Sequence, residues 1–200
     1  MSSLAKASPA PALDGDAPIV AETTAQARAR FFNSGNAFNL KMPKVPRARF
    51  DAARDAAMAA GAATGLYPMD QSAAIGCAFP ATTPLVLARY LRITAGDRLA
   101  TDFRASGEVL YVISGSGETT IAGETLAWGP GDVMVLPGGR GPVHAAGVSA
   151  PAILWCVTNE PALAFEHLSP PSSGEAAVDP VHYTATEIER QVDVLTSLPE

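Results

Sequence analysis

Between residues 82 and 160 the hydrophobic positions occur in short runs and not at helical spacing. Runs such as "EVLYVIS", "GDVMVLPGG" and "APAILWCVTN" are apolar or β-branched, and Gly, Pro and Ser separate them. This pattern is typical of short strands bounded by turns. Turns as tight as "SGSGE" and "IAGE" favour antiparallel strands over βαβ units. The chain therefore predicts an all-β antiparallel sandwich or barrel that closes near residue 160.

The segments on either side of this region predict helices. Residues 21–31 and 47–60 are rich in helix formers, and Gly35 and Gly61 stand where the two helices could stop. After the Pro- and Ser-rich "SPPSSGEAAVDP", the stretch "TATEIERQVDVL" predicts a short helix. Thr184 or Thr186 could cap this helix, and its apolar side would carry Ile188, Val192 and Leu195.

These patterns divide the chain into four parts. They are a flexible arm (1–20), a helical or irregular extension (21–80), a β-barrel (81–165), and a linker with a C-terminal helix (166–200). The first part has no apolar run of signal-peptide length, and no segment approaches the roughly 18 apolar residues that a spanning helix needs. We expect a protein that does not enter a membrane.

Charge and cysteine content narrow the expected partners. The formal net charge of −6 leaves no positive excess for phosphates, so nucleic acid and anionic membranes are excluded as main partners. Cys77 and Cys156 are far apart in sequence and form neither a disulfide framework nor a zinc motif. We expect a cytoplasmic protein that binds a small molecule or another protein.

The stretch from residue 96 to 115 has the spacing of a known metal motif without its ligands. Gly96, Glu108 and Gly115 stand where the first motif of the cupin family has Gly, Glu and Gly, while Asp102 and Arg104 occupy the two positions of its His-x-His. The chain therefore resembles the cupin family. The resemblance implies a jelly-roll barrel whose usual metal-binding histidines are replaced.

The second cupin motif is matched in the same partial way. Gly131, Pro137 and Gly139 fall in place, but the position of its histidine holds Pro142, and His144 lies two residues further on. The context "GETTIAGETLAWGPGDVMVLP" is similar to one barrel of the gentisate-type ring-cleaving dioxygenases, which depend on iron and usually contain two barrels. This chain could be a single-barrel relative or a fragment of a two-barrel protein.

The resemblance raises the question of whether a metal can bind. Side chains two apart in a strand share a face, so if Asp102 points into the barrel then Arg104 does too. A guanidinium is never a ligand and would repel a divalent ion. One reading is a buried ion-pair network in which Arg104 replaces the ion, neutralised by Asp102 and Glu108. A second reading is an altered site for Fe(II), Mn or Zn made of Asp102, Glu108 and His144. A third is a site that faces solvent and has no special role.

Arg89 adds a second candidate for the barrel interior. It lies in register with the apolar residues of "LVLARYLRI", which predicts that it points inward. With Arg104 it could form an anion-binding end of the cavity, suited to a small carboxylate such as an aromatic acid. Alternatively it extends to the rim or pairs with a local carboxylate.

These observations leave three hypotheses. The first is a degenerate cupin domain without a catalytic metal that binds a small acid through Arg89, Arg104, Glu108 and His144, or serves as partner barrel in a dioxygenase-like assembly. The second is a metal-dependent oxygenase or isomerase using the altered site. The third is a dimerisation module, because barrel faces often pack across a two-fold axis. We expect a homodimer in the first case as well.

Overall fold

The computed structural model describes residues 22–29 and 44–197 of the chain. The chain divides into two compact units, Met1–Lys44 and Val45–Glu200. In the first unit the described residues contain α1 (Thr24–Ala27), which begins with a capping box between Thr23 and Gln26. The predicted flexible arm and the predicted stop at Gly35 lie outside the described residues.

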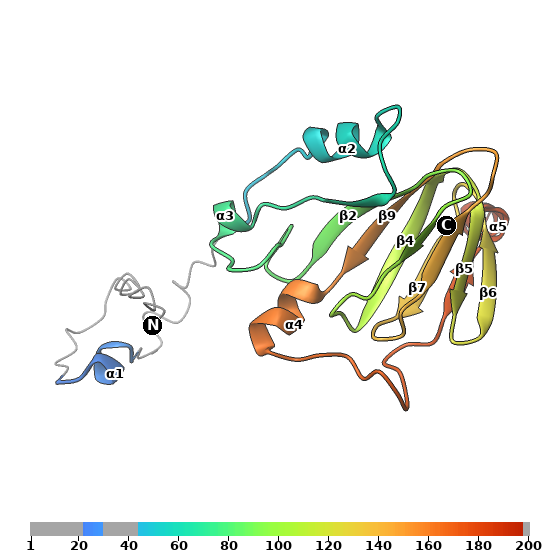
Figure 1. Ribbon diagram of the computed structural model, residues 1–200. Helices are drawn as coiled ribbons and strands as arrows, with labels where there is room; N and C mark the ends of the chain where they lie inside the picture. The colour runs from blue at the N-terminus through green and yellow to red at the C-terminus, as the bar shows by residue number, and fades with distance from the viewer. Residues whose placement is uncertain (1–21, 30–43, 198–200) are drawn as a thin grey trace. The chain divides into compact units, whose positions relative to one another are not determined.

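The second unit contains two antiparallel sheets (Figure 1). In spatial order, the first sheet consists of β1 (Gly65–Pro68), β2 (Leu87–Ile93), β9 (Ala152–Thr158), β4 (Gly107–Ser114), β7 (Val133–Pro137) and β10 (Val181–Tyr183). The second sheet consists of β3 (Arg98–Ala100), β8 (Val143–Ala146), β5 (Gly117–Ile121) and β6 (Glu124–Trp128).

The pairing of these strands is nested. β5 pairs with β6, β4 with β7, β3 with β8, and β2 with β9, so the pairs lie one inside another along the sequence. A long hairpin rolled up in this way gives the two four-stranded sheets of a jelly roll, and β1 and β10 extend the first of them to six strands. The prediction of an all-β, antiparallel jelly-roll barrel is confirmed.

The core lies between the two sheets. Strand β4 alternates between buried and exposed positions, as expected of a strand with one face on the core. The central cluster is apolar and includes Leu91, Leu110, Met134 and Leu154, each of them fully buried. Gly115 closes the turn after β4 with a φ of +79°, and a Cβ there would lie 2.5 Å from the carbonyl oxygen of Pro151.

Helices surround the barrel without entering it. α2 (Asp51–Met58) contacts β1 and β2, and the short α3 (Ser72–Ile75) lies in the connection between these two strands. α4 (Glu160–Glu166) follows β9 directly. α5 (Ala185–Thr196) begins at Thr184, whose side chain accepts a hydrogen bond from the amide of Glu187. The predicted C-terminal helix and its Thr184 cap are therefore confirmed.

Strand β10 and α5 are held to the barrel through one carboxylate. Asp132, directly before β7, accepts hydrogen bonds from His182 Nε2 at 3.0 Å and from the amide of Ala185 at 2.7 Å. Across residues 22–29 and 44–197 there is no helix long and apolar enough to cross a membrane.

Candidate functional site

A cluster of polar side chains lies inside the otherwise apolar barrel. Its buried members are Arg89 on β2, Thr101 after β3, Glu108 on β4, Thr119 on β5, His144 on β8 and Thr158 on β9. None of these residues is more than 3% exposed. Because burying polar groups is unfavourable unless they are paired, their partners define what the cluster can do.

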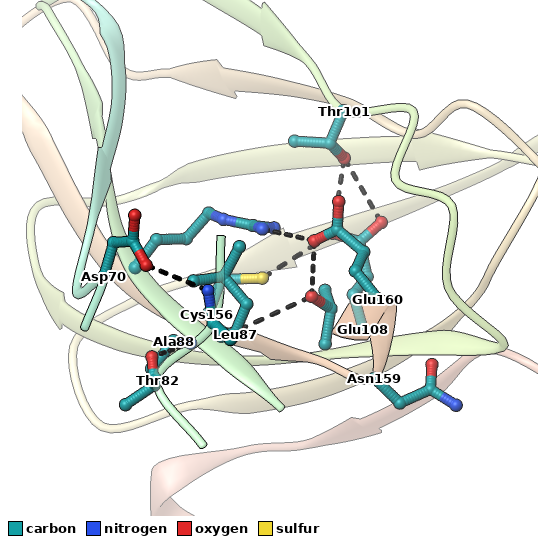
Figure 2. Close-up of polar contacts among 12 residues, drawn as sticks. Asp70, Thr82, Leu87, Ala88, Thr101, Glu108, Cys156, Asn159 and Glu160 are labelled. Atoms are coloured by element: carbon teal, nitrogen blue, oxygen red, sulfur yellow. Dashed lines mark hydrogen bonds and ion pairs between the residues drawn. The ribbon is translucent and has the colours of Figure 1, made fainter. Parts of the chain in front are cut away.

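Thr101 joins Glu108 to His144. Its hydroxyl oxygen lies 3.2 and 3.3 Å from the two carboxylate oxygens of Glu108 and 3.2 Å from Nε2 of His144. Figure 2 shows the Thr101 hydroxyl directed at the carboxylate from above, with the sulfur of Cys156 on another side at 3.9 Å. A single hydroxyl group therefore separates the carboxylate from the imidazole.

The other side of the imidazole is also bonded. Nδ1 of His144 lies 2.8 Å from the hydroxyl of Thr119, which accepts a hydrogen bond from Nε1 of Trp128 at 2.9 Å. An indole N–H can only donate, so the Thr119 proton is directed to Nδ1. His144 then carries its proton on Nε2 and donates to Thr101, which donates to Glu108. In this series of hydrogen bonds from Trp128 to Glu108, every donor has an acceptor when Glu108 is a carboxylate.

Burial shifts the pKa values of Glu108 and His144, the two ionisable groups in this series of hydrogen bonds. Burial raises the pKa of Glu108 to about 7, although the hydrogen bond from Thr101 and the charge of Arg89 oppose the shift. Burial lowers the pKa of His144 to about 4, so the imidazole is neutral near pH 7. Glu108 thus changes its charge near neutral pH next to a neutral histidine.

Arg89 forms the second part of the cluster. Its Nη2 pairs with Glu160 at the start of α4, and Thr158 donates a hydrogen bond of 2.6 Å to the same carboxylate. The guanidinium carbon lies 4.0 Å from the centre of the Phe103 ring, a cation–π contact. Nη1 is buried and has no hydrogen-bond partner in the part of the chain that the structure describes. Arg89 therefore points inward as predicted, and it pairs with a local carboxylate.

The loop that carries Phe103 is tied to the start of α4. The amide of Ser106 donates to Oδ1 of Asn159 at 2.8 Å, and Nδ2 of Asn159 donates to the Ser106 hydroxyl at 3.1 Å. The segments that carry Phe103 and Glu160, the two residues that contact the guanidinium, are thus connected to each other.

The structure does not place Asp102 and Arg104 inside the barrel, which agrees with the reading of a solvent-facing site. Both side chains are exposed, and Nε of Arg104 donates to the backbone carbonyl of Leu168 outside the barrel. Residues 101–106 form a loop between β3 and β4, and it is Thr101 and Phe103 that face the core. Arg104 therefore does not replace an ion, and the predicted buried network with Asp102 and Glu108 does not form.

The inward-facing residues are thus offset by one from the aligned histidine positions of the first motif. Thr101 and Phe103 face inward in place of Asp102 and Arg104, and the carboxylate of Glu108 and the imidazole of His144 lie next to Thr101. Sequence reasoning missed Thr101 and Phe103, although they continue the alternation of Leu99, which packs on the core. It also missed Glu160, for which the sequence has no signal.

The metal that the cupin resemblance implies does not fit these residues. In residues 22–29 and 44–197 there is no group of three or more His, Cys, Asp and Glu side chains that could hold a metal ion. The alternative set of Asp102, Glu108 and His144 is not brought together, because Asp102 is exposed while the other two are buried. A hydroxyl of Thr101 lies between the two retained donor residues.

The nested strand pairing and this altered cluster define the class of protein. The chain has a cupin-type jelly-roll barrel and resembles one barrel of the ring-cleaving dioxygenases. No family model matches it.

Two curated proteins share sequence with the chain. A 5-aminosalicylate 1,2-dioxygenase from Comamonas sp is 34% identical over 82 residues, covering 41% of this chain and 22% of that protein. A 4-deoxy-L-threo-5-hexosulose-uronate ketol-isomerase from Cereibacter sphaeroides is 43% identical over 84 residues, covering 39% of this chain and 29% of that protein. The chain thus spans less than a third of the length of either relative.

Among solved structures, a salicylate 1,2-dioxygenase from Pseudaminobacter salicylatoxidans has a TM-score of 0.45 at 18% identity. The match covers 60% of this chain and 31% of that one.

Proposed function

We propose that the chain is a degenerate cupin barrel that binds a small carboxylate next to Arg89, without a catalytic metal. The observation that carries the proposal is Nη1 of Arg89, a buried donor with no hydrogen-bond partner in the described residues. Leaving a buried donor unpaired costs about 1–3 kcal/mol, and more for a charged group. A ligand carboxylate oxygen bonded to Nη1 would remove this cost.

The surroundings of Arg89 favour an aromatic acid. The Phe103 ring lies on the guanidinium and would offer an apolar surface to a ring beside the bound carboxylate. The related 5-aminosalicylate dioxygenase acts, by its name, on an aromatic acid, which supports the same ligand class here. Arg104 has no part in this proposal, because its side chain lies outside the barrel.

Glu160 would share Arg89 with the ligand. Its carboxylate already occupies Nη2, and its side chain is 24% exposed, so it lies on the solvent side of the buried guanidinium. An incoming carboxylate either binds Nη1 beside Glu160 or displaces Glu160 and takes both nitrogens. In both cases the negative charge of Glu160 opposes binding.

Glu108 would couple binding to pH. The charge of Arg89 holds the pKa of Glu108 below the value that burial alone would give, although burial dominates and the pKa is raised to about 7. A bound carboxylate would partly neutralise Arg89, so Glu108 would take up a proton on binding. Affinity should therefore fall as the pH rises above about 7, by at most about tenfold per pH unit for one proton.

The test is isothermal titration calorimetry of the full chain at pH 6 with benzoate and salicylate, using benzamide as the neutral isostere. The variant is Arg89→Lys, which keeps the charge and loses the planar fork. Arg92→Lys is the matched control. Arg92 is also buried on β2, but it faces the other side and donates to the carbonyls of Ala57 and Ala62 at 2.8 and 2.9 Å.

We expect benzoate or salicylate to bind, benzamide not to bind, and Arg89→Lys to weaken binding at least tenfold. Arg92→Lys should bind the acids as the natural chain does. Equal affinity for benzoate and benzamide, or equal loss in both variants, would show that Arg89 does not recognise a carboxylate. Absence of binding for all compounds would reject the proposed ligand class.

A further inference from the structure

Residues 167–178, between α4 and β10, run across one end of the barrel, and we call them the strap. Figure 1 shows the strap as the orange stretch that leaves α4 and passes below the ends of β4 and β7. Both of its ends are fixed, because α4 is anchored by the buried Leu163 and β10 pairs with β7. The strap is therefore a bridge between two anchored elements.

Two arginines from neighbouring loops hold the strap in place. Arg104, in the loop between β3 and β4, donates from Nε to the carbonyl of Leu168. Arg140, in the loop between β7 and β8, donates to the carbonyl of Ser172 at 3.0 Å and to the carbonyl of Gly174. The strap is thus joined to both loops through its backbone carbonyls.

The same two loops border the polar cluster. The loop of Arg104 also carries Thr101, which bonds Glu108, and Phe103. The amide of Thr101 donates to the carbonyl of Pro142 at 3.0 Å, so the two loops lie side by side. The strap therefore lies against the end of the barrel that holds the polar cluster.

The polar cluster is closed off from solvent. Arg89 and Glu108 are each 3% exposed, so the carboxylate site proposed above, on which this inference rests, needs an opening movement before a ligand can enter. Strands β4 and β9 cannot supply this movement, because they pair from Glu108 to Ser114 and their separation would break both backbone hydrogen bonds and core contacts. The moving part must be a segment at the end of the barrel.

The strap has the properties of a segment that opens easily. Of its twelve residues ten are exposed, and only Pro170 and Ala176 are partly buried. The arginine hydrogen bonds that hold it lie at the surface. Segments with little buried apolar surface and with exposed hydrogen bonds open locally at a low cost in free energy. The strap can therefore open while the strands stay paired.

We infer that the strap is a lid that controls access to the barrel interior. Arg104 and Arg140 keep it closed by binding its carbonyls. When these bonds break, the loop of residues 101–106 loses its outer support, and Phe103 can move off the guanidinium of Arg89. The rate at which a ligand enters and leaves is then set by the strap.

Cys156 reports on access to the interior without any ligand. Its side chain is fully buried, and its sulfur lies 3.9 Å from the carboxylate of Glu108. Burial raises the pKa of the Cys156 thiol, and only the thiolate reacts, so the closed barrel should react slowly. The chain has two cysteines, so the variant Cys77→Ser leaves Cys156 as its single thiol. The measurement is the rate at which methyl methanethiosulfonate modifies Cys156 at pH 8, followed by intact-mass spectrometry.

The first substitution, made in the Cys77→Ser chain, loosens the strap. Arg140→Ala removes two of the three arginine hydrogen bonds and should raise the rate of Cys156 modification at least fivefold. Arg98→Ala is the matched control and should leave the rate unchanged. Arg98 is exposed on β3, and its side chain has no hydrogen bond or ion pair within residues 22–29 and 44–197.

A second pair of substitutions leaves both arginines in place. Gly139 and Gly141 have φ values of +70° and +55°, so alanine strains the backbone at either position. An added Cβ at Gly139 would lie 2.8 Å from the carbonyl oxygen of Pro171 in the strap, whereas at Gly141 it would meet no described atom within 4 Å. Gly139→Ala should therefore raise the rate of Cys156 modification, and Gly141→Ala should not. A melting curve and urea unfolding of each variant show whether it is folded and how stable it is.

The possible results separate the lid from the carboxylate site. Benzoate should slow the modification of Cys156. Faster modification in Arg140→Ala and Gly139→Ala without protection by benzoate would support the lid and count against the carboxylate site. Equal rates in these variants and their controls would overturn the lid, even if benzoate binds in calorimetry. Rates that follow only the free energy of unfolding would also overturn it, because unfolding of the whole barrel would then expose Cys156.

Discussion

Replacing Glu108 by Gln should stabilise the protein at neutral pH but not in acid. Burial raises the pKa of Glu108 from its ordinary value of 4.5 to about 7, so ionisation is less favourable in the folded than in the unfolded chain. The free energy of unfolding therefore decreases as the pH rises from about 4.5, where Glu108 ionises in the unfolded chain, to about 7, where it also ionises in the folded chain. Gln has the same shape and no charge, so it avoids the loss.

The size of the stability difference follows from the shift in the pKa of Glu108. Each pKa unit corresponds to about 1.4 kcal/mol, and a shift from 4.5 to about 7 gives a loss of about 3 kcal/mol at pH 7 and above. Glu108 is 3% exposed, so solvent screening removes little of this. The Gln side chain keeps an oxygen that accepts from Thr101, while its amide group would lie next to the same Thr101 hydroxyl and the sulfur of Cys156. An imperfect fit of this amide would lower the gain by about 1 kcal/mol.

The assay is urea unfolding of the natural chain and of Glu108→Gln at pH 4, 6 and 8. The difference in free energy of unfolding should be near zero or slightly unfavourable to Gln at pH 4, and should reach about 2–3 kcal/mol in favour of Gln at pH 8. Glu118→Gln serves as the control, because Glu118 is exposed on β5. A Glu108→Gln difference that does not depend on pH would refute the reasoning, because burial would then not control the ionisation of Glu108.

Further predictions concern the metal positions and the carboxylate site. Thr101→His places a second imidazole beside Glu108 and His144, a two-His, one-carboxylate set that suits Fe(II) or Zn. Elemental analysis of the purified variant should find added metal. Asp102→His, whose side chain points outward, should gain none, and equal uptake by both variants would contradict the placement of Thr101. Glu160→Gln removes the charge that competes for Arg89, so the affinity of this variant for benzoate should rise several-fold in calorimetry. An unchanged affinity would show that Glu160 does not compete with the ligand. In the natural chain, benzoate should bind more weakly at pH 8 than at pH 6 because Glu108 must be protonated, and this difference should vanish in Glu108→Gln.

The fold was predictable because its signals are local. The turns around Gly115, the short apolar runs and the Thr184 cap each act within a few residues, and the strands between residues 87 and 158 and the C-terminal helix form where these signals place them. The inward direction of Arg89 also followed from the apolar residues that share its register in the sequence, Leu87, Leu91 and Ile93, which the structure buries as well.

The polar cluster was only partly predictable. Motif spacing placed Asp102 and Arg104 at the ligand positions, but the count assumes a regular strand through residues 101–106, and these form a loop that leaves Thr101 and Phe103 facing inward. One residue of offset exchanges the two faces completely. Glu160 is 71 residues from Arg89 in sequence, and only the return of the chain through β9 brings the two together.

The nested strand pairing sets an order for assembly during synthesis. β5 and β6 are neighbours in sequence and can pair as a hairpin early. β2 can pair only after β9, which ends at Thr158, has been synthesised. The contact between Arg89 and Glu160 requires this last pairing, so a nascent chain that has not yet been extended to Glu160 lacks this ion pair. Long-range pairs of this kind form slowly because the intervening chain must first be ordered. The charged interior residues therefore stay hydrated in the nascent chain until the barrel closes around them.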